Sequence, residues 1–211
     1  RLKRFRYGAE FLEALFPGRL RVSGGLLYAF GGHQVTEAVP IPIAWPAALA
    51  VLDLTTPSHP IPIGRLDLGT FQGGDLVVGP TAAYAIGPSA LQAIDISDPM
   101  APLPTTGVAA GGDAAALAGS RLYASAGSGG LLVVDVGNPT APTAPTGVDT
   151  AGRTPDVAAG EALAASVDEA FGLRVHAIDA AGEPVLLGRL ALPGARDVVV
   201  QGSYAYASAR L

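Results

Sequence analysis

The stretch Leu131-Leu-Val-Val-Asp135-Val-Gly-Asn-Pro139 decides the fold, because it recurs along the chain. Close copies are Leu49-Ala-Val-Leu-Asp53-Leu-Thr-Thr-Pro57 and Leu91-Gln-Ala-Ile-Asp95-Ile-Ser-Asp-Pro99, and a weaker copy is Leu173-Arg-Val-His-Ala-Ile-Asp179. The last aspartates of successive copies, at 53, 95, 135 and 179, are 42, 40 and 44 residues apart. Self-similarity at such a period is the signature of a repeat architecture.

Two further elements recur in the same order. A Tyr-Ala pair lies roughly ten residues before most copies, at Tyr28, Tyr84 and Tyr123, and again at Tyr206 near the end. An aspartate followed by small or β-branched residues opens most repeats, at Asp75, Asp113, Asp156 and Asp197. All these elements are short, apolar and bounded by Gly, Pro, Asn or Asp, which is a strand-and-turn pattern.

The pattern predicts an all-β protein. One repeat is expected to give four antiparallel strands, near residues 75–78, 82–86, 91–96 and 103–108. Four such strands in about 40 residues form the blade of a β-propeller. A β-solenoid or a β-sandwich is the alternative fold.

With these residues the chain resembles the LVIVD-repeat family of bacterial and archaeal β-propellers. The resemblance covers about residues 19–211, and it is strongest in the second and third repeats. The first repeat departs from the pattern by an insertion at 31–48, and the fourth lacks the tyrosine. The resemblance implies a propeller that is extracellular or at the cell surface, in a family whose members mostly lack an assigned activity.

The repeats predict the following segments: a strand of a preceding blade with its connection at 1–18, four blades at 19–72, 73–110, 111–153 and 154–194, and the start of a fifth at 195–211. Because both ends fall within a blade, we expect an incomplete ring, cut from a longer protein. The alternative is a ring closed by the two ends of the chain.

Composition excludes some classes of partner. The net charge is −5 and the pI is about 5.1, whereas binding to nucleic acid phosphates needs a clustered basic surface. No apolar run reaches the length of about 18 residues that a membrane span requires. The chain has no cysteine, so thiolate metal sites and disulfides are absent. We therefore expect neither nucleic acid binding nor a membrane span in this segment.

The four repeat-opening aspartates are the candidate metal site. If Asp75, Asp113, Asp156 and Asp197 each begin an innermost strand, their carboxylates could form a ring at one mouth of the central channel. Ca²⁺ prefers such oxygen ligands, so Ca²⁺ is the one cofactor that the sequence suggests. The alternative is that each aspartate caps its own turn, as we expect for Asp53, Asp95 and Asp135.

The insertion in the first repeat is the candidate partner-binding site. It contains His33, Glu37 and the single tryptophan, Trp45. Loops on a rigid scaffold often carry binding residues, and Trp is enriched at binding hot spots. Packing over a neighbouring blade would explain Trp45 equally well.

No residue is nominated as catalytic, because no acid, base and nucleophile motif is present. The sequence favours a non-enzymatic binding propeller within a larger surface or secreted protein, with a protein or carbohydrate ligand. The alternative function is a hydrolase or lyase whose site lies at the channel mouth.

Overall fold

The computed structural model describes residues 15–33, 47–148 and 152–210, which form five antiparallel β-sheets and contain no helix. We call the sheets blades 1 to 5. Blade 1 contains β1 (Leu15–Ser23), β2 (Leu26–His33), β3 (Ala47–Asp53) and β4 (Ile61–Asp67). Blade 2 contains β5 (Asp75–Val78), β6 (Ala82–Ile86), β7 (Leu91–Asp95) and β8 (Leu103–Val108). Blade 3 contains β9 (Ala114–Ala118), β10 (Arg121–Ser125), β11 (Leu131–Asp135) and β12 (Thr146–Val148). Blade 4 contains β13 (Asp156–Ala159), β14 (Leu163–Asp168), β15 (Gly172–Ile178) and β16 (Pro184–Leu190), and blade 5 contains β17 (Ala195–Gln201) and β18 (Tyr204–Ala209).

Within each sheet, strands that follow one another in the chain are hydrogen-bonded neighbours. Short turns make this meander possible, and a glycine at positive φ lies in several of them, for example Gly119 between β9 and β10 and Gly202 between β17 and β18. Each sheet is thus built from one continuous stretch of about 40 residues or less, as the repeat predicts.

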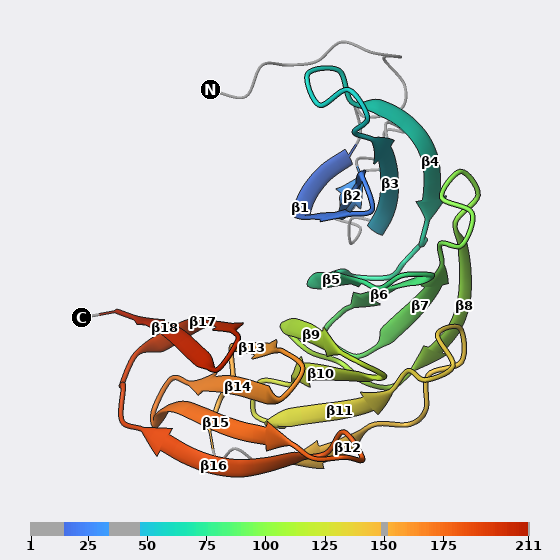
Figure 1. The fold of residues 1–211 in the computed structure, drawn as a ribbon. Helices are drawn as coiled ribbons and strands as arrows, with labels where there is room; N and C mark the ends of the chain where they lie inside the picture. Colours follow the sequence, from blue (N-terminus) through green and yellow to red (C-terminus); the bar gives the residue numbers. More distant parts are fainter. Residues whose placement is uncertain (1–14, 34–46, 149–151, 211) are drawn as a thin grey trace, which may run out of the picture.

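The five blades follow one another around an open arc (Figure 1). The first strands of the blades, β1, β5, β9, β13 and β17, lie on its inner side and contact one another in sequence. The last strands, β4, β8, β12 and β16, lie on the outer side (Figure 1). The described strands leave the arc open between blade 5 and blade 1, so the expectation of a propeller with an incomplete ring is confirmed.

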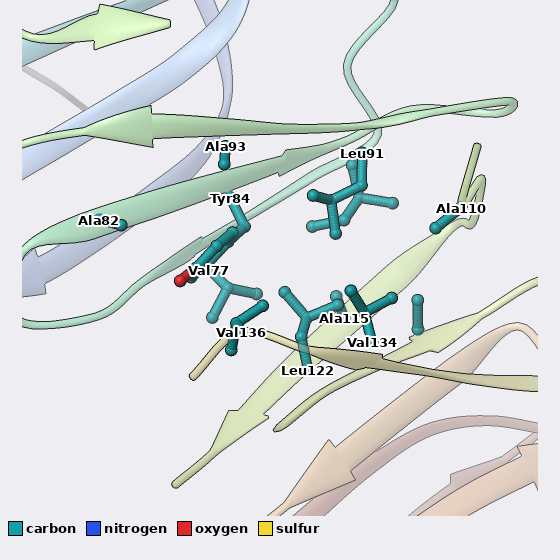
Figure 2. Packing of buried hydrophobic residues seen from close by; sticks show 12 residues of the cluster. Val77, Ala82, Tyr84, Leu91, Ala93, Ala110, Ala115, Leu122, Val134 and Val136 are labelled. Atoms are coloured by element: carbon teal, nitrogen blue, oxygen red, sulfur yellow. The ribbon is translucent and has the colours of Figure 1, made fainter. Parts of the chain in front are cut away.

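The blades are held together by apolar side chains that lie between their faces. Between blades 2 and 3, the ring of Tyr84 packs with Val77 toward Leu122 and Val134 of the next blade (Figure 2). Both partners on blade 3 are fully buried. Small residues, such as Ala83 and Ala85 between blades 1 and 2, allow close approach of neighbouring sheets.

The aspartate at the end of each third strand caps the turn that follows. The Oδ1 atoms of Asp53, Asp95 and Asp135 accept hydrogen bonds from the backbone N–H two residues later, at 2.7, 2.9 and 2.7 Å. These bonds lower the pKa of Asp95 and of Asp135. The predicted turn-capping role is therefore confirmed for these residues.

The first sheet differs from its predicted limits. β1 begins at Leu15, whereas the sequence places the first blade at 19 and assigns 1–18 to a preceding strand and a connection. The first repeat has no aspartate at the opening of its inner strand, so the pattern that marks this strand elsewhere is missing.

No helix among the described residues is long and apolar enough to cross a membrane.

Candidate functional site on the inner strands

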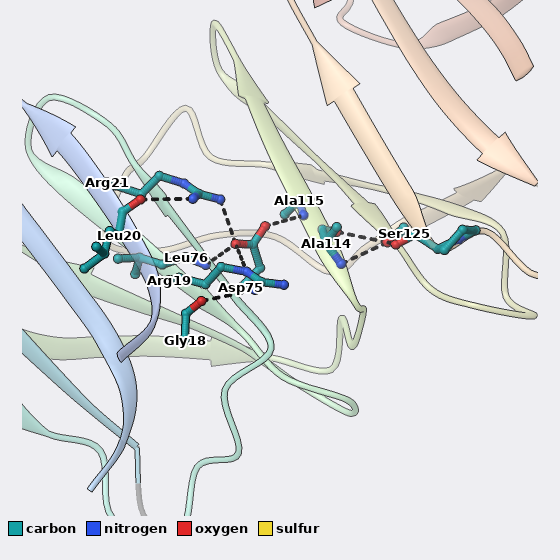
Figure 3. Close-up of polar contacts among 10 residues, drawn as sticks. Gly18, Arg19, Leu20, Arg21, Asp75, Leu76, Ala114, Ala115 and Ser125 are labelled. Atoms are coloured by element: carbon teal, nitrogen blue, oxygen red, sulfur yellow. Dashed lines mark hydrogen bonds and ion pairs between the residues drawn. The ribbon is translucent and has the colours of Figure 1, made fainter. Parts of the chain in front are cut away.

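Asp75 is the best-connected polar residue of the inner surface. It is the first residue of β5, and only 4% of it is exposed. Its Oδ1 accepts hydrogen bonds from Arg19 Nε at 3.0 Å and from Arg21 Nη2 at 2.7 Å (Figure 3). Both arginines lie on β1 two positions apart, so they point to the same side of that strand. Asp75 thereby ties blade 2 to blade 1.

The same carboxylate also reaches blade 3. Its Oδ1 accepts the N–H of Leu76 at 2.8 Å, and its Oδ2 accepts the N–H of Ala115 on β9 at 3.1 Å (Figure 3). A carboxylate has about four acceptor sites, and Asp75 holds four N–H donors. It therefore has little capacity left to bind a metal ion or to take a proton from a substrate.

Asp156 connects blade 4 to blade 5 in a related way. It is the first residue of β13, and its Oδ2 accepts the N–H of Val198 on β17 at 2.8 Å. Burial raises the pKa of Asp156, although the backbone N–H groups of Val198 and Val157 lower it. The charges of Asp197 and Asp75 raise it further. Asp75 and Asp197 thus both disfavour the charged form of Asp156.

Asp113 does not occupy the predicted position. β9 begins at Ala114, so Asp113 lies one residue before the strand instead of opening it. Register explains the difference: Val77 pairs with Tyr84 in blade 2 and Ala116 pairs with Tyr123 in blade 3. Ala114, two residues before Ala116, is therefore the counterpart of Asp75. Side chains alternate between the two faces of a strand, so an offset of one residue changes the face.

Asp113 instead belongs to a chain of surface ion pairs. Its side chain is 50% exposed, and its Oδ2 accepts a hydrogen bond from Arg153 Nη2 at 2.9 Å. Arg153 Nη1 lies 3.0 Å from Glu169 Oε1, which in turn lies 3.7 Å from Arg196 Nη1. These pairs join blades 3, 4 and 5 along the inner side. Exposed pairs of this kind contribute about 0–1 kcal/mol each.

Asp197 is the third residue of β17, so it does not open that strand either. Its Oδ2 accepts a hydrogen bond from Ser208 Oγ on β18 at 2.9 Å. In the part of the chain that the structure describes, no three His, Cys, Asp or Glu side chains are grouped as metal ligands would be. The charges of Asp75 and Asp197 act on Asp156, and Ca²⁺ binding by the four aspartates stays a prediction.

Comparison with known proteins supports the predicted repeat. The family model of the LVIVD repeat matches residues 111–150 and 194–209, which take in the inner strands β9 and β17. These two segments match the LVIVD repeat. A search of curated proteins gives no sequence match.

The fold of this chain is also seen in a solved structure. The chain is similar to the crystal structure of the N-terminal domain of Nup159, with a TM-score of 0.57 and 12% sequence identity. The match covers 87% of this chain and 49% of that one, so this chain spans about half the length of that structure. At this identity the likeness shows the fold alone.

The predicted partner-binding residues lie in the insertion of the first repeat. His33 is the last residue of β2, and its side chain lies outside the description. Glu37 and Trp45 lie outside the described residues. Their role in binding stays a prediction.

Sequence reasoning missed the arginines that bind the aspartates. Arg19, Arg21 and Arg153 carry no repeat signal, because each occurs in one repeat only. The alternation of Arg19 and Arg21 in a strand beside the Asp75 strand is the signal that could have found the first cluster.

Proposed function

We propose that this chain is a non-enzymatic binding propeller and that an extended polypeptide strand adds to blade 5, which has two strands among the described residues. The observation that supports this is the exposure of an apolar, aromatic face on the β17–β18 hairpin. Val199 is 60% exposed and Tyr206 is 57% exposed. Their counterparts in blade 2, Val77 and Tyr84, are 9% and 2% exposed, because blade 3 covers them.

The backbone next to this face is also suited to binding. In blade 2, β6 pairs with β5 on one side and with β7 on the other. Among the described residues, β18 pairs with β17 alone. An edge strand offers a row of N–H and C=O groups to an extended polypeptide, which is the basis of recognition by strand addition.

The two features together favour a protein ligand. The rings of Tyr204 and Tyr206 lie 6.4 Å apart on the exposed face of β18. Tyrosines are enriched at protein interfaces because they combine apolar area with a polar end. An extended segment with apolar residues at alternate positions would pair with the edge of β18. A carbohydrate could stack on the tyrosines but could not use the strand edge.

We favour binding over a hydrolase or lyase at the channel mouth because the inner aspartates already have donors. Asp75 holds four N–H groups, and Asp113 pairs with Arg153. Following the family resemblance, we also propose that the protein acts outside the cell or at its surface. Ca²⁺ binding by the aspartates is retained as a proposal, and a thermal-shift titration that shows no change at millimolar Ca²⁺ would remove it.

The test uses a labelled synthetic peptide that copies residues 131–148, the third and fourth strands of an LVIVD repeat. We expect saturable binding to the native chain by fluorescence anisotropy, and loss of binding in the double variant Val199→Ser, Tyr206→Ser. The matched control is Leu103→Ser, which alters an exposed apolar residue on the outer strand β8. Equal binding by the native chain and the double variant, or binding of a scrambled peptide, would refute a site on blade 5.

A further inference from the structure

Blade 4 presents a set of buried polar side chains to blade 3. Ser166 and Asp168 lie on β14, and Arg174 and His176 lie on β15. Ser166 pairs with Arg174, and Ala164 pairs with His176. Because paired residues point to the same face and residues two apart in a strand do too, all these side chains share one face. Ala164 belongs to the apolar cluster with Leu131 and Val133 of blade 3, so that face is the one turned toward blade 3.

The other blades are apolar at the same positions. Register gives the counterparts of Ser166 as Ala29, Ala85 and Ala124, and those of His176 as Leu52, Ile94 and Val134. All six counterparts are buried. Blade 4 therefore replaces alanine by serine and a branched aliphatic residue by histidine at one blade interface.

Three of the polar atoms at this interface lack partners. Among the residues that the structure describes, no group forms a hydrogen bond with Ser166 Oγ, Asp168 Oδ2 or His176 Nδ1. All three residues are at least 98% buried. A buried polar group without a hydrogen bond disfavours the closed form by about 5- to 150-fold in equilibrium constant, relative to a form in which water reaches it.

Contacts around this region hold the two blades together. Tyr123 Oη donates a hydrogen bond to Gly182 O at 2.8 Å, and burial raises the pKa of Tyr123 to about 12. Ser125 Oγ donates to Pro155 O at 3.4 Å, and Val157 packs against blade 3. The interface therefore combines a bonded and apolar part with a polar part that closure leaves unsatisfied.

We propose that the interface between blades 3 and 4 is the joint at which the arc opens. Opening hydrates Ser166, Asp168 and His176, whereas opening between blades 2 and 3 would expose apolar side chains and break the hydrogen bond from the Ala115 N–H to Asp75. The arc then separates into two rigid parts, blades 1 to 3 and blades 4 to 5. This inference does not depend on the binding role of blade 5.

Thiol labelling of single introduced cysteines tests the proposal, because the native chain has no cysteine. Ala164→Cys places a thiol at the joint, and Ala83→Cys places one at the equivalent position between blades 1 and 2. Both alanines are fully buried, so labelling needs an opening. We expect Ala164→Cys to react at least about tenfold faster in native buffer, after correction for the intrinsic reactivity of each thiol in denaturant.

The second part of the experiment uses repeat-matched substitutions, which introduce the residue type that other blades carry at the same position. Adding Ser166→Ala and His176→Val should slow labelling of Ala164→Cys by about tenfold or more and leave labelling of Ala83→Cys unchanged. Ser166→Ala alone, which removes one oxygen, is the variant to use if the pair perturbs folding, and its expected effect has the same direction. Equal labelling rates at the two cysteines, or no slowing by the repeat-matched substitutions, would overturn the proposal.

Discussion

Replacing Asp75 by alanine tests whether the buried carboxylate stabilises three blades at once. Asp75→Ala removes the acceptor for Arg19 and Arg21 of blade 1, for Leu76 of blade 2 and for Ala115 of blade 3. The matched control is Asp113→Ala, which removes an exposed aspartate with a single arginine partner. Sequence treats these two aspartates as equivalent, whereas the structure does not.

The size of the destabilisation by Asp75→Ala depends on which of its former hydrogen-bond donors can bind water instead. The arginine side chains are 44% and 39% exposed, so water can replace part of what they lose. Leu76 and Ala115 are buried, and an N–H group left there without an acceptor costs about 1–3 kcal/mol. Two such groups, with the lost charge-assisted bonds, give a destabilisation of about 3–5 kcal/mol for Asp75→Ala. Asp113→Ala should cost no more than about 1 kcal/mol.

Urea unfolding monitored by circular dichroism measures both variants. With a slope of about 2 kcal/mol per molar urea, Asp75→Ala should lower the midpoint by about 2 M. Hydrogen exchange at the amides of Leu76 and Ala115 should accelerate more than at amides of blade 4. If the two variants shift the midpoint equally, by less than about 0.5 M, then Asp75 is no more than a surface ion pair and the reasoning fails.

Three further outcomes are expected. Gly64→Ala should destabilise the protein by about 1–3 kcal/mol in thermal unfolding, because the added Cβ would lie 2.1 Å from the carbonyl oxygen of Pro99. The control is Gly188→Ala, at the same register in blade 4. A Cβ there meets nothing within 4 Å, so this variant should be nearly neutral. Burial, reinforced by Arg174 and Arg189, lowers the pKa of His176 below 6.5, so the unfolded chain takes up the proton first as pH falls. The free energy of unfolding should therefore decrease below about pH 6.5, by up to about 1.4 kcal/mol per pH unit. If the native chain and a His176→Val variant have the same pH profile, this prediction is wrong. The raised pKa of Asp156 has the opposite sign, so the free energy of unfolding should fall as pH rises above about 3.8, and Asp156→Asn should remove that part of the pH dependence while still accepting the Val198 N–H.

The strands could be predicted because local pattern and global fold agree in this chain. Apolar runs of five or six residues end at an aspartate that caps a turn, and a period near 40 residues leaves room for four strands. The structure places β5, β6 and β8 at the predicted residues and ends β7 one residue earlier. A β-solenoid or sandwich would have used the same strands, and the sequential pairing within each sheet excludes them.

The polar contacts could not be predicted because they depend on the phase of each strand, that is, on which face of the sheet each residue's side chain points to. The run Gly-Gly-Asp before apolar residues occurs at both 73–75 and 111–113, and in sequence the two look alike. Strand β5 starts on the aspartate and β9 starts one residue after it. That shift directs Asp75 into the space between blades and leaves Asp113 exposed. Only the pairing with the next strand, which sequence does not contain, fixes the phase.

The same dependence on phase explains why the polar interface of blade 4 is visible only by comparing blades. Leu173-Arg-Val-His-Ala-Ile-Asp179 differs from Leu131-Leu-Val-Val-Asp135 by a strand two residues longer, so counting back from the aspartate aligns the wrong positions. Pairing with the second strand aligns His176 with Val134 and with Ile94. A histidine that could lie on an exposed face is thereby placed between two sheets, at a position where blades 1 to 3 carry an aliphatic side chain. The departure from the repeat, more than the repeat itself, is what singles out this interface as the place where the arc can move.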